Sequence, residues 1–114
     1  MAAGNVRSPQ AGPVVAVYGA TGHTGRFVVA ELLRRGFVPV AVARDEAKLA
    51  VSGFRERGVA TRSASIDAPR SLDQAFTGAS AVINCAGPFM DTAGAVAAAA
   101  LHAGVHYLDV SAEQ

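Results

Sequence analysis

The sequence contains a single cysteine, Cys85, and no tryptophan, and 17% of its 114 residues are charged. One cysteine excludes an intrachain disulfide framework and a metal site built from several cysteines. The formal net charge is +1 and no block of either sign is present, so we expect no nucleic-acid partner. The longest apolar stretch, Ala93 to Leu101, is too short to cross a bilayer. Residues 1–12 lack the apolar centre of a secretion signal, and we expect a cytoplasmic protein without a membrane partner.

The length and apolar content of the chain suit one folded domain. Hydrophobic residues make up 51% of the sequence, which is too apolar for a disordered segment and enough to bury a core. Residues 1–12 are mostly small or polar and predict a flexible lead-in. Residues 13–114 are then expected to form one domain.

Short apolar runs alternate with helix-type patterns along this domain. Runs of this kind suit strands buried on both faces, and the intervening segments carry apolar residues at helical spacing. Such an alternation predicts an α/β fold, a Rossmann-type doubly wound parallel sheet of about five strands with helices on both faces. The expected strands are residues 14–18, 38–43, 59–65, 79–84 and 105–110, and the expected helices are residues 24–35, 45–57, 71–76 and 92–103.

The sequence ends shortly after the fifth expected strand. A domain that ends there would have little surface outside its sheet and helices, so we expect an N-terminal fragment of a longer chain. The fifth strand would leave an uncovered sheet edge, which invites pairing. A homodimer is therefore a further expectation.

A glycine-rich loop directly follows the first expected strand and opens the first helix. Its glycines have the spacing G-x-x-G-x-x-G, and this context turns a weak pattern into a dinucleotide-binding hypothesis. The first glycine permits the turn, the second lets the backbone approach a pyrophosphate, and the third lets the helix pack near the strand. Amides of the first helical turn would then face the phosphates. A turn without a ligand is the alternative, and His23 could equally be a solvent-facing loop residue. The cofactor-binding residues expected here are Gly19, Ala20, Thr21, Gly22, His23, Thr24 and Gly25.

The end of the second expected strand distinguishes NADP from NAD. An acidic residue there bonds the ribose hydroxyls of NAD, whereas an arginine accepts the 2′-phosphate of NADP. Arg44 occupies this position, and Asp45 follows it where a helix N-cap is expected. We therefore favour NADP, with Arg44 pairing to the 2′-phosphate and Lys48 adding charge. Both could instead be surface charges, and NAD becomes plausible if Asp45 turns inward.

Two further loops follow the third and fourth expected strands. Asp67 could accept a hydrogen bond from the adenine amino group, or could cap the third helix. Small residues after the fourth strand leave room for the ribose and nicotinamide, since ligands of open α/β sheets bind across that edge. Cys85 in this loop could equally be an inert buried thiol. The cofactor-binding residues expected in the second loop are Cys85, Ala86, Gly87 and Pro88.

No catalytic residue can be named from the sequence. Lys48 is the only lysine and lies far along the chain from Tyr18 and Tyr107, so there is no Tyr-x-x-x-Lys acid/base pair. The serines and histidines form no recognisable nucleophile–base order. The catalytic residues are unknown, and no metal ligands are expected.

Three segments together resemble the saccharopine dehydrogenase-like NAD(P)-binding domain, and most closely its oxidoreductase and trans-acting enoyl reductase branch. They are the glycine loop, the segment Asn84-Cys85-Ala86-Gly87-Pro88-Phe89, and the segment Gly104-Val105-His106-Tyr107-Leu108-Asp109-Val110-Ser111 with Glu113. Ala112 departs from the glycine usual in the family. The resemblance also implies a large second domain that builds the substrate pocket, and we expect that domain to lie outside this sequence.

The resemblance implies NAD(P)-dependent oxidoreduction, on either an amino-acid-derived C–N bond or a C=C bond of a lipid precursor. We therefore expect the NADP(H)-binding domain of an oxidoreductase that transfers a hydride to or from a small-molecule substrate, and expect the fragment alone to be inactive. The alternative is a stand-alone NAD(P)(H)-binding sensor without catalysis.

Overall fold

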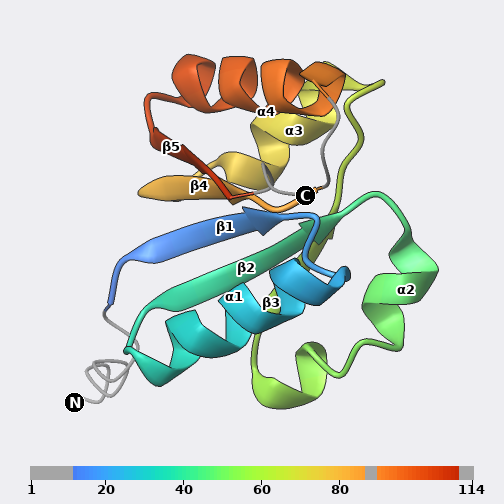
Figure 1. Cartoon of the computed structure of the whole chain (residues 1–114), viewed down its shortest axis with the longest axis vertical. Coiled ribbons are helices and arrows are strands. Elements are labelled where there is room, and N and C mark those ends of the chain that lie inside the picture. Colours follow the sequence, from blue (N-terminus) through green and yellow to red (C-terminus); the bar gives the residue numbers. More distant parts are fainter. Residues whose placement is uncertain (1–11, 87–89, 111–114) are drawn as a thin grey trace, which may run out of the picture.

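The computed structural model describes residues 12–86 and 90–110, which form one parallel sheet with helices on both faces (Figure 1). The strand order is β3-β2-β1-β4-β5, and every neighbouring pair is parallel. The predicted doubly wound α/β fold is therefore confirmed. The elements are β1 (Val14–Tyr18), α1 (His23–Arg34), β2 (Val38–Ala43), α2 (Glu46–Ala50), the 3₁₀ helix η2 (Arg55–Arg57), β3 (Ala60–Ser63), α3 (Pro69–Phe76), β4 (Ala81–Asn84), α4 (Met90–Ala103) and β5 (His106–Asp109).

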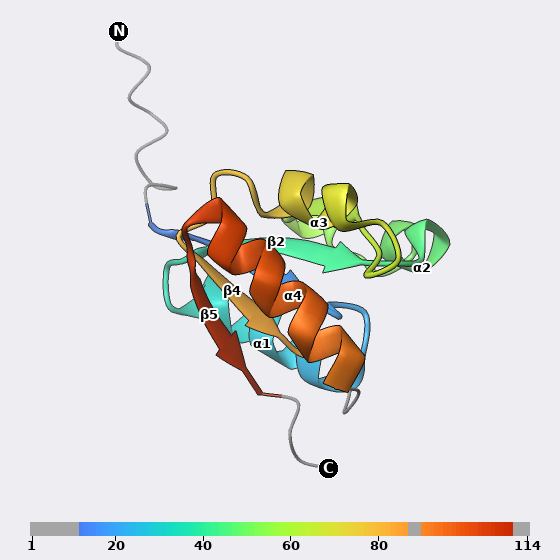
Figure 2. The ribbon, with the colours of Figure 1, turned by 90° about the horizontal axis from the view of Figure 1, so that it is seen from above.

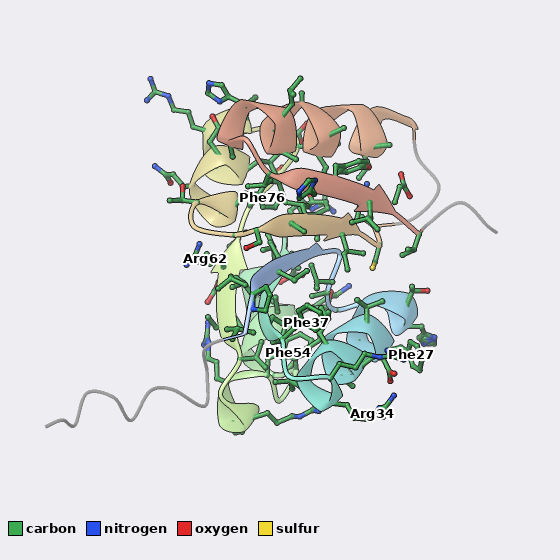
Figure 3. All side chains as sticks on the ribbon, turned by 90° about the vertical axis from the view of Figure 1, so that its left-hand side faces the viewer. Phe27, Arg34, Phe37, Phe54, Arg62 and Phe76 are labelled. Atoms are coloured by element: carbon green, nitrogen blue, oxygen red, sulfur yellow. The ribbon has the colours of Figure 1, made fainter. Side chains whose placement is uncertain are left out.

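Two separate apolar layers cover the sheet. On one face α3 and α4 pack against the sheet, and Phe76 is fully buried there among residues such as Leu72 and Val96. On the other face α1 and the segment around α2 pack against it, with Phe54 and Leu49 buried. Figure 3 shows Phe76 on the side of α3 and α4, and Phe54 on the side of α1. The central strands β1 and β2 are thus buried on both faces, as their continuous apolar runs predict.

The second predicted helix, residues 45–57, is wrong in its extent. Helix α2 ends at Ala50, and η2 follows after a turn. The Ser52 hydroxyl donates to the Leu49 carbonyl oxygen and accepts from the Phe54 amide, and Gly53 has a φ of +90°. Serine commonly competes with the helix for backbone bonds in this way. The turn places Phe54 in the core, where a continuing helix would have carried it elsewhere.

The third helix begins earlier than predicted and is not capped by Asp67. Helix α3 starts at Pro69, its N-cap is Ala68, and no side chain caps it. Proline suits the first helical position because its missing N–H would have had no partner there. The Ser71 hydroxyl instead donates to the Ala68 carbonyl oxygen and accepts from the Ser65 amide. The capping role considered for Asp67 is therefore wrong.

Strands β3 and β5 form the two edges of the sheet. The edge position of β3 agrees with its more polar sequence, and Leu108 and Val110 are exposed at the β5 end. In residues 12–86 and 90–110, no helix has the length and apolarity to span a membrane, and no cluster of His, Cys, Asp or Glu could hold a metal ion.

Candidate functional site

The candidate site lies at the carboxyl ends of the strands, where the strand order reverses. From β1 the chain winds outward through β2 to β3, and then returns to the other side of β1 through β4 to β5. Figure 2 shows α1 and α4 on opposite faces of the sheet. Crevices at such a reversal are the usual ligand sites of open α/β sheets. The glycine loop between β1 and α1 occupies this position.

The first part of the glycine loop is held by its own backbone bonds. The amides of Gly19 and Ala20 both donate to the Val42 carbonyl oxygen, at 2.8 and 3.1 Å, and the Gly22 amide donates to the Gly19 carbonyl oxygen at 3.2 Å. The amides of Gly19 and Gly22 are therefore already paired within the protein. These glycines shape the loop.

Several amides around the start of α1 have no hydrogen-bond acceptor in the described part of the protein, and we call them the open amides. Helix α1 has Gly22 as its N-cap, and no side chain caps it. Within the described part of the chain, no protein group accepts a hydrogen bond from the amides of Thr21, His23, Thr24 and Gly25. These donors stand at the positive end of the dipole of a 12-residue helix. The arrangement suits an anion with several oxygens.

Steric crowding explains two of the glycines. A Cβ atom on Gly19 would lie 2.7 Å from the Ala86 Cα, and Gly19 has a φ of +81° that other residues rarely adopt. A Cβ atom on Gly25 would lie 2.7 Å from the Ala20 Cα. Gly25 thus packs the start of α1 directly onto the end of β1, the role that its spacing predicts.

A cavity of about 300 Å³ opens beside the loop. The predicted residues that line it are Gly19, Thr21, Arg44 and Ala86, and the neighbours Asp45 and Lys48 also line it. Four further lining residues were not predicted as site residues: Tyr18, Ala43, Ile66 and Thr92. The predicted residues that do not line it are Ala20, Gly22, His23, Thr24, Gly25, Asp67 and Cys85, while Gly87 and Pro88 lie outside the described residues.

The end of the cavity beside β2 is basic. Arg44 and Lys48 are both exposed there, and no described residue forms an ion pair with either. The adjacent Asp45 is occupied, since its carboxylate accepts from the Ala47 amide at 2.9 Å and from the Lys48 amide at 3.2 Å. Asp45 is therefore the N-cap of α2, as predicted, and its orientation leaves the two cations to meet a ligand.

Tyr18 is a further polar residue of the cavity wall. Its side chain is almost fully buried, and burial is the main reason that its pKa is raised. Asp67 acts in the same direction, while Arg44 and a hydrogen bond with the Ile66 backbone partly oppose the rise in pKa. The hydroxyl therefore stays protonated at neutral pH. Lys48, distant in sequence from Tyr18, lines the same cavity.

Arg26 supports the loop from outside the cavity. Its Nε donates to the Thr21 carbonyl oxygen at 3.2 Å and its Nη1 to the Ser52 carbonyl oxygen at 3.4 Å, with the guanidinium 5.9 Å from the centre of the Phe54 ring. The side chain thus ties the glycine loop to the turn after α2. The side chain is exposed.

Cys85 and Asp67 lie near the cavity without lining it. Cys85 is buried in the layer on the α1 face, and burial, with a smaller effect of Asp109, raises the pKa of its thiol to about 11. A protonated thiol is a poor nucleophile, which agrees with the inert alternative. Asp67 is exposed, and its amide donates to the Ser65 hydroxyl.

Comparison with known proteins points to one family and one kind of ligand. The family model for the saccharopine dehydrogenase NADP binding domain matches residues 15–114. Triphenylmethane reductase of Citrobacter sp. is 30% identical, with a TM-score of 0.74 over 85% of this chain and 36% of that one. Its complex with NADP(H) is also 30% identical, with a TM-score of 0.73 over 84% of this chain and 36% of that one.

A second solved structure is similar over the same region. The NADPH-dependent quinone oxidoreductase QOR2 of Escherichia coli, solved with NADPH, is 27% identical, with a TM-score of 0.68 over 80% of this chain and 34% of that one. The chain therefore spans about a third of the length of these solved chains, 36% and 34% respectively. No curated protein sequence matches the chain significantly.

Proposed function

The chain belongs to the family of saccharopine dehydrogenase NADP-binding domains, and from this premise we propose which of its residues hold the cofactor. The pyrophosphate lies over the open amides of Thr21, His23, Thr24 and Gly25. Gly19, Ala20 and Gly22 shape the loop beneath it. One observation carries this proposal. The glycine loop, with its open amides at the start of α1, adjoins a cavity that Arg44 and Lys48 also line.

Arg44 receives the 2′-phosphate in this proposal, and Lys48 adds to the positive field. Their exposure and lack of an ion-pair partner among the described residues support the assignment. The bonding of Asp45 Oδ1 to two amides at the start of α2 supports NADP over NAD, because these bonds hold the side chain in its N-cap role. An arginine fork and a lysine charge are the usual partners of a phosphate.

The loop after β4 faces the other end of the cofactor. Ala86 lines the cavity, and we assign the ribose–nicotinamide side of the cofactor to Ala86, Gly87 and Pro88. Cys85 is buried. Asp67 is assigned to the adenine side, since it follows β3. NADP(H) supplies the hydride that is transferred, and the protein's part is binding and orientation. The substrate is a small molecule held by further residues of a longer chain.

Titration with NADPH and NADH tests the proposal directly. Nicotinamide fluorescence of NADPH should change saturably on adding the 114-residue chain, and NADPH should bind more tightly than NADH. NADP⁺ should compete. Absence of binding by either reduced cofactor at millimolar concentration would remove the proposal, and tighter binding of NADH would overturn the assignment of Arg44.

A further inference from the structure

A hydrogen-bond chain that runs through one buried side chain joins β5 to the wall of the cavity. Asn84, at the end of β4, is fully buried. Its Nδ2 donates to the Tyr107 hydroxyl oxygen at 3.2 Å, and its Oδ1 accepts from the Ala86 amide at 3.0 Å. The Tyr107 hydroxyl in turn donates to the Asp109 carboxylate at 3.1 Å. Every link is a hydrogen bond of ordinary length.

The register of the sheet places these groups in one row at its carboxyl edge. Asn84 stands beside Tyr18 of β1 on one side and beside Asp109 of β5 on the other. Tyr18 lines the cavity, whereas Asn84, Tyr107 and Asp109 do not. The polar row therefore continues from the cavity into a part of the sheet that does not line it.

Ala86 is the point where this chain reaches the site. Its backbone packs tightly on Gly19, since a Cβ atom on Gly19 would lie 2.7 Å from the Ala86 Cα. Both residues line the cavity. The preceding amide, of Cys85, donates to the Tyr18 carbonyl oxygen at 2.8 Å. The Ala86 amide itself is held by Asn84. Asn84 thus sets where the chain leaves β4 relative to the glycine loop.

We propose that Asn84 and Tyr107 are positioning residues of the NADP(H) site, and that Asp109 orients Tyr107. Strand β5 then contributes to cofactor affinity without contacting the cofactor. This inference rests on the proposed function. The side-chain oxygen and nitrogen of the buried Asn84 both form hydrogen bonds. Breaking either bond would leave a desolvated polar group without a partner, so the side chain stays in one conformation.

A purely structural role predicts something different. If the chain only satisfied polar groups in the core, its loss would lower stability and leave the affinity of the folded protein for cofactor unchanged. A positioning role predicts weaker binding by protein that is still folded. The weakening should be equal for NADPH and NADH, because the basic end beside β2 is untouched.

The decisive variant is Tyr107→Phe in the complete 114-residue chain. It keeps the ring and removes only the hydroxyl that links Asn84 to Asp109. We expect the Kd for NADPH and for NADH to rise by the same factor, roughly three- to tenfold, the scale of one hydrogen bond. The matched control is Leu108→Thr, the next residue of β5, whose side chain is half exposed. The control should bind like the wild type.

Amide hydrogen exchange followed by NMR gives a readout that does not depend on cofactor. In the wild type the Ala86 amide should exchange slowly, and in Tyr107→Phe it should exchange faster while amides of β1 stay protected. An unprotected Ala86 amide in the wild type overturns the inference even if the variant fails to fold. Unchanged affinity in folded Tyr107→Phe also overturns it. If the wild type binds neither cofactor, the proposed function fails instead, and the exchange data still report on the hydrogen-bond chain.

Discussion

Gly25 lies so close to Gly19 that a Cβ atom on Gly25 would stand 2.1 Å from the Gly19 carbonyl oxygen. Both sides of this contact are backbone, so no side-chain rotation can relieve it. The contact packs the first turn of α1 onto the end of β1 and thereby fixes where the open amides stand relative to that strand. Helix position and ligand geometry are thus set by the same pair of residues.

Gly25→Ala is therefore expected to destabilise the fold. Inserting a methyl group into a close-packed backbone contact costs about 1–3 kcal/mol. Urea unfolding followed by circular dichroism measures the loss. Gly94→Ala is the matched control, because a Cβ atom there meets nothing within 4 Å. Alanine at this helical position should stabilise by roughly 0.5–1 kcal/mol. Equal effects of the two substitutions would contradict the packing argument.

Arg44→Ala is expected to lower the affinity for NADPH and to leave that for NADH nearly unchanged. A charge-assisted bond to the 2′-phosphate is worth about 1.5–3 kcal/mol, because one partner is an ion. Isothermal titration with both cofactors measures the difference. Lys48→Ala, which changes a second exposed cation lining the cavity, should have a smaller effect in the same direction. A loss of equal size for both cofactors would refute selection by Arg44.

Asp45 allows its capping role to be separated from its charge. Asp45→Ala removes the acceptor of the Ala47 and Lys48 amides and should cost about 1 kcal/mol of stability, as for other N-caps. Asp45→Asn keeps an acceptor and should retain most of that stability. It also removes a negative charge beside the proposed 2′-phosphate, so NADPH should bind more tightly. Thermal unfolding and NADPH titration of both variants test the two parts, and weaker NADPH binding by Asp45→Asn would contradict the second.

The sequence pattern predicts the bounds of those strands whose residues are apolar throughout. The runs at β1 and β2 are apolar throughout, and both strands have the predicted bounds. The break after Ala50 was missed because it depends on Ser52 bonding within its own turn and on Phe54 finding a place in the core. The sequence pattern reports helix propensity, but it does not include the stabilisation that comes from burying Phe54 in the core.

The same division applies to the candidate site. Gly19, Thr21 and Arg44 were identified because each belongs to a motif or directly follows a strand. Tyr18 and Thr92 line the same cavity, but their meeting depends on crossovers that bring the end of β1 and the start of α4 together. The sequence offers one indication that Tyr18 belongs to the site, because its hydroxyl group stands at the end of an otherwise apolar strand. Thr92 carried no comparable signal.

Cys85 provides a probe of the β4 end of the site, because every thiol adduct of this chain reports on that one residue. Burial raises the pKa of its thiol to about 11, against an ordinary value of 9.0. At pH 7.5 we therefore expect iodoacetamide to modify the folded protein far more slowly than the urea-unfolded protein, as measured by mass spectrometry. Fast modification of folded protein would show that Cys85 is neither buried nor protonated.

The raised pKa of Cys85 also predicts how stability depends on alkaline pH. Since the folded state holds the thiol proton more tightly than the unfolded state, this contribution is complete below about pH 9 and is lost as the pH rises toward 11. Tyr18 and Tyr107 have raised pKa values too, so the wild type as a whole should lose stability in alkali. Cys85→Ala removes only the thiol, and its unfolding free energy should fall less steeply than that of the wild type between pH 9 and 11. Identical slopes would mean that Cys85 does not titrate differently in the two states, and that the packing around the β4 end is looser than the structure has it.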